Sequence, residues 1–173
     1  MRYPIAPLIR FTLLTLYLAL VLPLPMVAPP ELKPWLWAAL PLGLLPVGAM
    51  LSEQVVLDAD GIHVGYPAWC GWLLRRGWQL SWAEIAGLVP ITTSQGGTVH
   101  YVKSRHGSHY LLPQRVGRFP DFLERFQQGS GLDTLRIGRI TPPWTYWTLA
   151  VLSLLLLIGE VGAISRAPWM QVN

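Results

Sequence analysis

Charge-free apolar stretches alternate with polar segments along this chain. Three such stretches lie at residues 11–30, 34–52 and 140–159. Each holds about 20 residues, the length at which a helix crosses the roughly 30 Å hydrocarbon layer of a bilayer. The pattern predicts three membrane-spanning helices. The first two form a hairpin within residues 1–52, and the third, with its flanks, covers residues 136–164 before a short tail at 165–173.

Proline interrupts the N-terminal pair of stretches, with Pro41 and Pro46 inside the second. Membrane helices tolerate proline where neighbouring groups satisfy the freed carbonyls. A cleaved signal peptide is the alternative interpretation of residues 11–30. A cut after Ala28 would place Pro29 beside the scissile bond, which suits signal peptidase poorly, so we expect a retained helix.

Basic residues indicate the orientation of the predicted helices. Arg2 and Arg10 precede the first stretch, and Arg136 and Arg139 precede the third. Only Arg166 follows the third stretch. Because cytoplasmic flanks of membrane helices are enriched in Lys and Arg, we expect the N-terminus and the central polar segment in the cytoplasm and the C-terminus on the opposite side.

The central segment, residues 53–135, has the pattern of a small β-rich module. Two short apolar runs flank the turn sequence at residues 58–61, and residues 98–104 alternate with the period of a half-buried strand. The last element has apolar residues on one helical face, namely Phe119, Phe122, Leu123 and Phe126. The predicted fold class is α+β, with an antiparallel sheet or partial barrel closed by an amphipathic helix.

The order of motifs in this module resembles that of a known family. VVLDADGIHV begins at residue 55, W-x-L-S-W-x-E-I-x-G-L at 78, YLLP at 110 and FPDFLERF at 119. Over about residues 53–132, this series is similar to the bacterial pleckstrin-homology-like (PH-like) domains attached to membrane helices. The resemblance implies that the D-x-x-G-I hairpin opens the sheet and that Glu84 and Ile85 fix a strand entry. The aromatic insert at 69–78 and the following membrane helix depart from the family pattern.

The pair of N-terminal helices before such a module also resembles the photosystem I assembly-factor family of cyanobacteria and plastids. The third helix is not part of that family's pattern, so the likeness is one of architecture. Together the two resemblances imply a bacterial protein in a cytoplasmic (inner) or thylakoid membrane.

Composition narrows the function classes. Of the 173 residues, 13% are charged and 52% hydrophobic, whereas an average soluble domain has about 25% charged residues. This excludes an ordinary cytosolic enzyme domain and a disordered chain. The single Cys70 cannot form an internal disulfide, and no phosphate-binding glycine loop is present. We therefore expect no cofactor, and we expect Cys70 to be a buried structural residue.

The histidines are the candidate metal ligands. His100, His106 and His109 lie within ten residues, and His100 and His109 would share a face if Ser104 paired with His109. His63 would have to approach from another strand. A metal site needs three or four ligands, and no acid lies on that hairpin, so we expect a solvated hairpin tip and no metal.

Carboxylates give no acid–base pair, so we expect no catalytic residues. The acids of the module stand in turns or at a helix start, where local hydrogen bonds and the helix dipole favour them. Glu160, near the end of the third stretch, is the one acid that suggests a proton or ion path.

The candidate contact residues combine tryptophan and arginine. Trp69, Trp72, Arg75, Arg76 and Trp78 form one cluster in sequence, and Arg136 and Arg139 precede the third stretch. Such residues suit an anionic headgroup layer or a protein partner; the alternatives are the core and rim of the fold, or topology signals. Residues 53–139 hold nine Lys and Arg against seven Asp and Glu, a balance that does not call for nucleic acid.

The predicted function is that of a non-enzymatic integral membrane protein. Its module would contact another membrane protein, as an assembly factor, accessory subunit or scaffold, and the second resemblance extends this to a photosynthetic complex. The first alternative is a sensor of anionic lipid headgroups, and the second, based on Glu160, is a component of a transporter or proton pathway. No small-molecule substrate is predicted.

Overall fold

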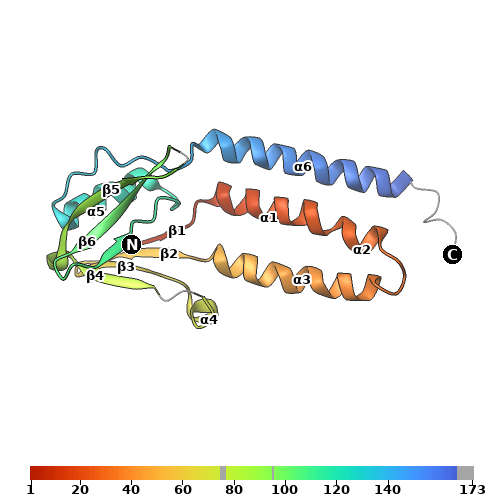
Figure 1. The fold of residues 1–173 in the computed structure, drawn as a ribbon, viewed down its shortest axis with the longest axis horizontal. Helices are drawn as coiled ribbons and strands as arrows, with labels where there is room; N and C mark the ends of the chain where they lie inside the picture. Colours follow the sequence, from red (N-terminus) through yellow and green to blue (C-terminus); the bar gives the residue numbers. More distant parts are fainter. Residues whose placement is uncertain (75–76, 95, 167–173) are drawn as a thin grey trace. The chain divides into compact units, whose positions relative to one another are not determined.

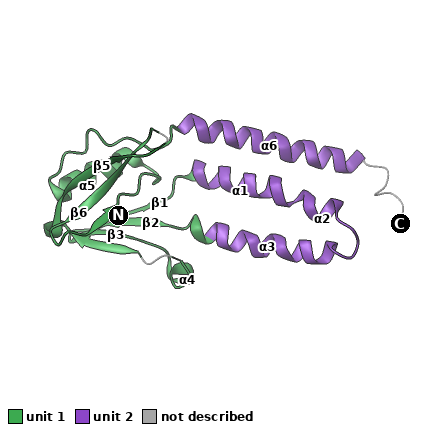
Figure 2. Ribbon diagram, in the orientation of Figure 1, with its two compact units in different colours: residues 1–7, 49–142 green, residues 8–48, 143–173 purple. Residues whose placement is uncertain are grey.

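The computed structural model describes residues 1–74, 77–94 and 96–166. The chain divides into two compact units (Figure 2). Unit 1 contains Met1–Pro7 and Ala49–Pro142, and unit 2 contains Leu8–Gly48 and the chain from Pro143 onward. Unit 1 holds all the described strands and the described elements of unit 2 are helices, so the predicted α+β class is confirmed.

The first sheet of unit 1 has four antiparallel strands in the order β1-β2-β3-β4 (Figure 1). They are β1 (Arg2–Pro4), β2 (Gln54–Leu57), β3 (Gly61–Gly65) and β4 (Trp78–Ser81). The predicted turn between β2 and β3 is confirmed. The Asp58 Oδ1 atom accepts hydrogen bonds from the backbone N–H groups of Asp60 (3.1 Å) and Gly61 (2.9 Å), the local bonding that favours aspartate in turns.

The strand β1 comes from the N-terminal residues. The predicted module covers residues 53–135, so β1 is a strand of unit 1 that lies outside the predicted bounds. Tyr3 pairs with Val55, and Pro4 with Gln54. The N-terminal amine of Met1 donates to the carbonyl oxygen of Leu57. The helices between β1 and β2 are therefore inserted between two neighbouring strands of one sheet.

The second sheet has three antiparallel strands in the order β5-β6-β7, namely β5 (Ile85–Thr92), β6 (Thr98–Ser104) and β7 (His109–Leu111). The 3₁₀ helix η1 (Trp82–Glu84) separates β4 from β5. The prediction of one antiparallel sheet or partial barrel is met only in part: the described strands are antiparallel, but they form two separate sheets and no closed barrel. The chain leaves the first sheet at η1, and β5 pairs with β6 instead of continuing the ladder of β4.

The predicted amphipathic helix is confirmed as α5 (Phe119–Ser130). Phe119, Phe122 and Phe126 are buried on its inner face, and the Phe122 ring meets the Tyr3 ring edge-on at 5.5 Å. These rings pack in one core with apolar residues from both sheets. At the end of α5, Gly131 has φ = 70°, the left-handed conformation that glycine adopts without strain.

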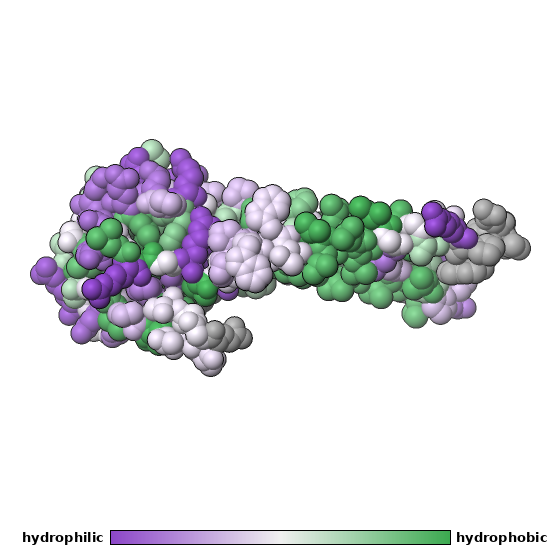
Figure 3. Space-filling model, turned by 90° about the horizontal axis from the view of Figure 1, so that it is seen from above, coloured by the Kyte–Doolittle hydropathy of each residue, from purple (hydrophilic) through white to green (hydrophobic). Residues whose placement is uncertain are grey.

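Unit 2 contains the helices α1 (Pro7–Val21), α2 (Pro23–Val27), α3 (Lys33–Met50) and α6 (Pro143–Arg166), of which the ends of α1 and α3 belong to unit 1. Among the described residues, two helical segments are long and apolar enough to cross a membrane, Pro7–Val27 and Pro143–Arg166. Figure 3 shows apolar side chains over the middle of the helical unit on the face that is seen. The second predicted stretch, residues 34–52, is helical, as α3, but it does not meet the same criterion, because Lys33, Pro41 and Pro46 lower its hydropathy.

Polar contacts join the helices of unit 2. The Thr12 hydroxyl of α1 donates to the Tyr146 carbonyl of α6 at 3.1 Å. The Tyr17 hydroxyl of α1 donates to the Leu40 carbonyl of α3 at 2.6 Å. A Cβ atom at Gly43 would overlap the Tyr17 hydroxyl, so a glycine at this position gives the Tyr17 ring room against α3.

Candidate interaction surfaces

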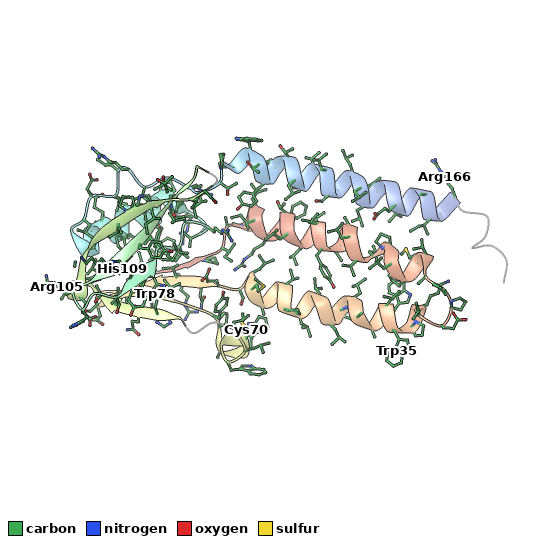
Figure 4. The ribbon with its side chains drawn as sticks, viewed as in Figure 1. Trp35, Cys70, Trp78, Arg105, His109 and Arg166 are labelled. Carbon is green, nitrogen blue, oxygen red and sulfur yellow. The ribbon has the colours of Figure 1, made fainter. Side chains whose placement is uncertain are left out.

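The short helix α4 (Ala68–Gly71) and the residues directly after it carry the most exposed aromatic side chains among the described residues of unit 1. Trp69 is 58% exposed, Trp72 80% and Leu73 64%. The Trp72 indole N–H donates to the Trp69 carbonyl at 3.0 Å, which fixes its direction. Cys70 is buried between them, as expected of a structural cysteine, with its Sγ 3.1 Å from the Ser52 Oγ (Figure 4). We call residues 68–73 the α4 segment.

Trp78 lies apart from the α4 segment in the structure. It belongs to β4, where it pairs with Val64, and its ring stacks on the Tyr110 ring at 5.1 Å. It packs against the core as a half-buried residue, which favours the alternative in which this tryptophan belongs to the rim of the fold. Arg75 and Arg76, the centre of the predicted cluster, lie outside the described residues.

The remaining candidate residues stand between α5 and α6. Arg136 and Arg139 are both exposed, and the Arg139 guanidinium carbon lies 5.5 Å from the centre of the Phe119 ring. Arg118 makes a similar contact, at 5.4 Å, with the Tyr3 ring. A cation over an aromatic face is attracted by the ring quadrupole, so these two arginines are held in place while their charges remain in solvent.

The histidines do not converge. β6 and β7 pair Lys103 with His109, so His109 lies on the opposite face of the sheet from His100. The condition for a shared face, a pairing of Ser104 with His109, is therefore not met. His100 is buried beside the Gln114 side chain, with 3.4 Å between its Nδ1 and the amide nitrogen, and this burial lowers the pKa of His100. Across the described residues, no three His, Cys, Asp or Glu side chains form a group that could hold a metal ion.

Two acids of unit 1, Glu84 and Asp121, are engaged by hydrogen bonds. Glu84 Oε2 accepts hydrogen bonds from the backbone N–H (2.9 Å) and hydroxyl (2.8 Å) of Ser81, and these bonds lower the pKa of Glu84. Asp121 Oδ2 accepts from the Tyr3 hydroxyl at 2.6 Å, which lowers the pKa of Asp121. Both carboxylates therefore have a structural role. Glu84 accepts hydrogen bonds at the start of η1, and Asp121 accepts one from a tyrosine of the core.

An open groove that the sequence patterns did not predict runs along the outer side of α5. Its volume is about 760 Å³. Leu135, 88% exposed, is its most accessible apolar side chain. The lining combines apolar and hydrogen-bonding residues: Pro120, Leu123, Glu124, Gln127, Gln128, Gly131, Thr134, Leu135 and Ile137. The one signal in the sequence is Leu135, an apolar residue between Thr134 and Arg136 in a polar segment, and a single leucine is too common to identify a groove.

In unit 2, Glu160 differs from the acids described above, because no contact in the described part of the chain accounts for the position of its buried carboxylate oxygen. Its Oε2 atom is buried and has no hydrogen-bond partner among the described residues. The residue lies in α6, in the last two turns before Arg166. This is the position on which the proton-path alternative depends.

These features define a class: an α+β protein in which a β-rich unit is connected to helices, two of them long and apolar enough to cross a membrane. The chain is 41% identical over 168 residues to the uncharacterized protein slr0269 of Synechocystis sp. (strain ATCC 27184 / PCC 6803 / Kazusa), and the match covers 94% of this chain and 84% of that protein. The chain belongs to the family of this cyanobacterial protein. No protein-family model and no solved structure matches the chain.

Proposed function

We propose that this protein is a non-enzymatic integral membrane protein whose β-rich unit binds another membrane protein, as an assembly factor, accessory subunit or scaffold. The observation that carries the proposal is the groove along α5. Its lining combines apolar side chains, among them the exposed Leu135, with amides and a carboxylate, which is the mixed character of a protein interface. The partner segment would offer an apolar side chain to Leu135 and hydrogen-bond donors to Glu124 and Gln127.

The PH-like assignment of unit 1 is part of this proposal. It is supported by the order of the elements. The Asp58 turn, η1 with Glu84, the β6–β7 hairpin and α5 follow one another as the family resemblance implies. The addition of β1 from the N-terminus distinguishes this chain from a module that starts at β2.

Three membrane crossings are also part of the proposal, and the pairing of β1 with β2 supports them. Because Pro4 pairs with Gln54 in one sheet, both residues lie on the same side of any membrane. If Pro7–Val27 crosses the bilayer, the chain must cross back before Gln54, and α3 is the helix between them. With α6 as the third crossing, unit 1 lies on the cytoplasmic side, where the arginine distribution favours it.

The family relationship supports a bacterial membrane, and we extend the proposal to a photosynthetic complex in a thylakoid or plasma membrane because the relative is cyanobacterial. Anchoring would confine the search for the partner to two dimensions and raise the effective concentration of a weak contact.

The test is co-purification of the full-length protein in mild detergent from its native membrane. Leu135→Asp places a charge at the edge of the groove, and we expect it to remove a stoichiometric partner. Ile91→Asp is the matched control, because Ile91 is an exposed apolar residue on β5 outside the groove. Retention of the partner by Leu135→Asp, or recovery of the wild-type protein alone, would contradict the proposal. Resistance of both variants to alkaline extraction tests membrane insertion separately.

A further inference from the structure

One end of unit 1 collects the points at which the chain passes to and from its helices. Ala6 precedes the start of α1 at Pro7, and Ser52 follows the end of α3 at Met50. The Ile5 N–H donates to the Glu53 carbonyl at 3.4 Å, which brings these two connections side by side. We call this the connector end of unit 1. The opposite end carries the β2–β3 and β6–β7 turns (Figure 1).

The α4 segment is fixed to the connector end. Cys70 is buried against Ser52, two residues after α3, with 3.1 Å between Sγ and Oγ. The exposed Trp69, Trp72 and Leu73 are thus held at the level of a helix terminus. Exposed aromatic rings with one hydrogen-bonding group are the side chains that collect at the boundary between lipid headgroups and hydrocarbon.

Arginines continue this surface beyond Ile5. The Ala6 N–H donates to the Arg115 carbonyl at 2.9 Å, and the Gly117 N–H donates to the Pro4 carbonyl at 2.8 Å. Arg118 follows at once, with its guanidinium over Tyr3, and Arg139 lies over the neighbouring Phe119. A continuous series of contacts therefore leads from the α4 segment to three exposed arginines.

The acidic residues of unit 1 are distributed differently from these arginines. Asp58, Asp60 and Glu84 stand at the opposite end, where the Trp82 N–H donates to the Asp60 carbonyl and the Arg105 N–H to the Glu84 carbonyl. At the connector end, Asp121 is engaged by Tyr3 and Arg125, and Glu53 also has a partner. Arg115, Arg118, Arg125 and Arg139 outnumber Asp121 and Glu53 at the connector end, so its net charge is positive and complements an anionic surface.

We propose that the connector end of unit 1 lies against the headgroup layer of an anionic phospholipid bilayer. Trp69, Trp72 and Leu73 enter the interface, and Arg115, Arg118 and Arg139 face lipid phosphates. The inference rests on the membrane-inserted helices of the proposed function and does not depend on the groove along α5. In this proposal the surface with Trp69, Trp72 and Leu73 contacts lipid, and the groove along α5 binds the protein partner.

The first test measures the depth of the α4 segment in the full-length protein. Leu73→Cys and the control His106→Cys, at the opposite end, are spin-labelled in a Cys70→Ser background and reconstituted into vesicles of phosphatidylglycerol and phosphatidylcholine. We expect the label at 73 to collide more with oxygen than with a water-soluble nickel chelate, and the label at 106 to show the reverse. Equal chelate access at both positions would overturn the proposal. A label at 73 that is protected only in native membranes would also overturn it, by assigning the surface to a protein partner.

The second test compares two pairs of charge-removing substitutions in the same vesicles. Arg115→Gln with Arg139→Gln acts at the connector end, and Lys103→Gln with Arg105→Gln removes the same charge at the opposite end. We expect the first pair to lower the enrichment of phosphatidylglycerol retained by the purified protein by roughly fivefold for each arginine, and the second pair to leave it unchanged. Equal effects would refute a specific headgroup contact. If alkaline extraction released the wild-type protein, the membrane insertion itself would fail, which is a separate result.

Discussion

Replacement of Tyr3 by phenylalanine tests whether the N-terminal strand is an integral part of the β-rich unit. The Tyr3 ring is fully buried against Phe122, and its hydroxyl donates to Asp121 at 2.6 Å. A hydrogen bond to a charged acceptor contributes about 1.5–3 kcal/mol. Because Asp121 is partly exposed and also accepts from Arg125, we expect a loss of about 2 kcal/mol, or roughly 4–8 °C in Tm for a chain of this size.

The same substitution has a distinctive pH dependence. Burial and the hydrogen bond to Asp121 raise the pKa of Tyr3 from 10.0 to about 12. A raised pKa means that the folded state holds the proton more tightly, so this stabilisation is complete below pH 10 and is lost as the pH rises toward 12. At pH 11 the wild-type protein has lost about 1 kcal/mol of it, whereas Tyr3→Phe has no phenol to titrate. The stability difference should therefore shrink to roughly half of its value at pH 8.

The assay is thermal unfolding of the full-length protein in mild detergent at pH 8 and pH 11, followed by near-ultraviolet circular dichroism. The control is Tyr101→Phe, which removes a phenol from β6 whose hydroxyl makes no side-chain hydrogen bond among the described residues. A difference between wild type and Tyr3→Phe that stays constant across this range would refute the assigned cause. A Tyr3→Phe protein with unchanged Tm at pH 8 would refute the docking of β1 itself.

Three further substitutions test other parts of the structure. In α5, Gly129→Ala should lower Tm even though alanine favours a helix by about 1 kcal/mol, because its Cβ would lie 2.5 Å from the Trp82 ring; Gln128→Ala, on the exposed side, should not lower it. His100 has a lowered pKa because it is buried, so the stability it contributes is complete above pH 6.5 and declines as the pH falls below that value. His100→Gln should therefore flatten the acid side of a plot of Tm against pH. An unchanged plot would contradict the burial argument. In α6, Glu160→Gln should leave Tm undiminished, since Oε2 has no partner to lose among the described residues; a marked drop would indicate that the charge itself is needed.

Local patterns were sufficient to predict several elements of unit 1. The Asp58 turn and the phenylalanine face of α5 each depend on residues within a few positions of one another. The same is true of the β6–β7 hairpin, although its register pairs His109 with Lys103. A one-residue difference in register reverses the face of every side chain, and the sequence of the turn does not determine it alone.

Non-local contacts could not be predicted in this way. β1 has three residues, too few for a visible alternation, and its partner β2 lies about 50 residues away. The separation into two sheets depends on η1, whose hydrogen bonds from Ser81 to Glu84 end one ladder and start another. The groove requires α5 and Leu135 to meet, and no periodic pattern connects them.

The position of β1 also indicates how the two units depend on each other during folding. Closing a flexible loop of about 50 residues costs roughly 3–4 kcal/mol, by the logarithmic dependence of closure entropy on length. This cost is comparable to the stabilisation that the burial of Tyr3 and the three-residue ladder of β1 can supply. The contact from Tyr17 to Leu40 bears on this balance, because a pairing of α1 with α3 holds Pro7 and Met50 close together and so shortens the loop that β1 has to close. The pairing of α1 with α3 therefore turns a costly long-range pairing of β1 with β2 into a short one.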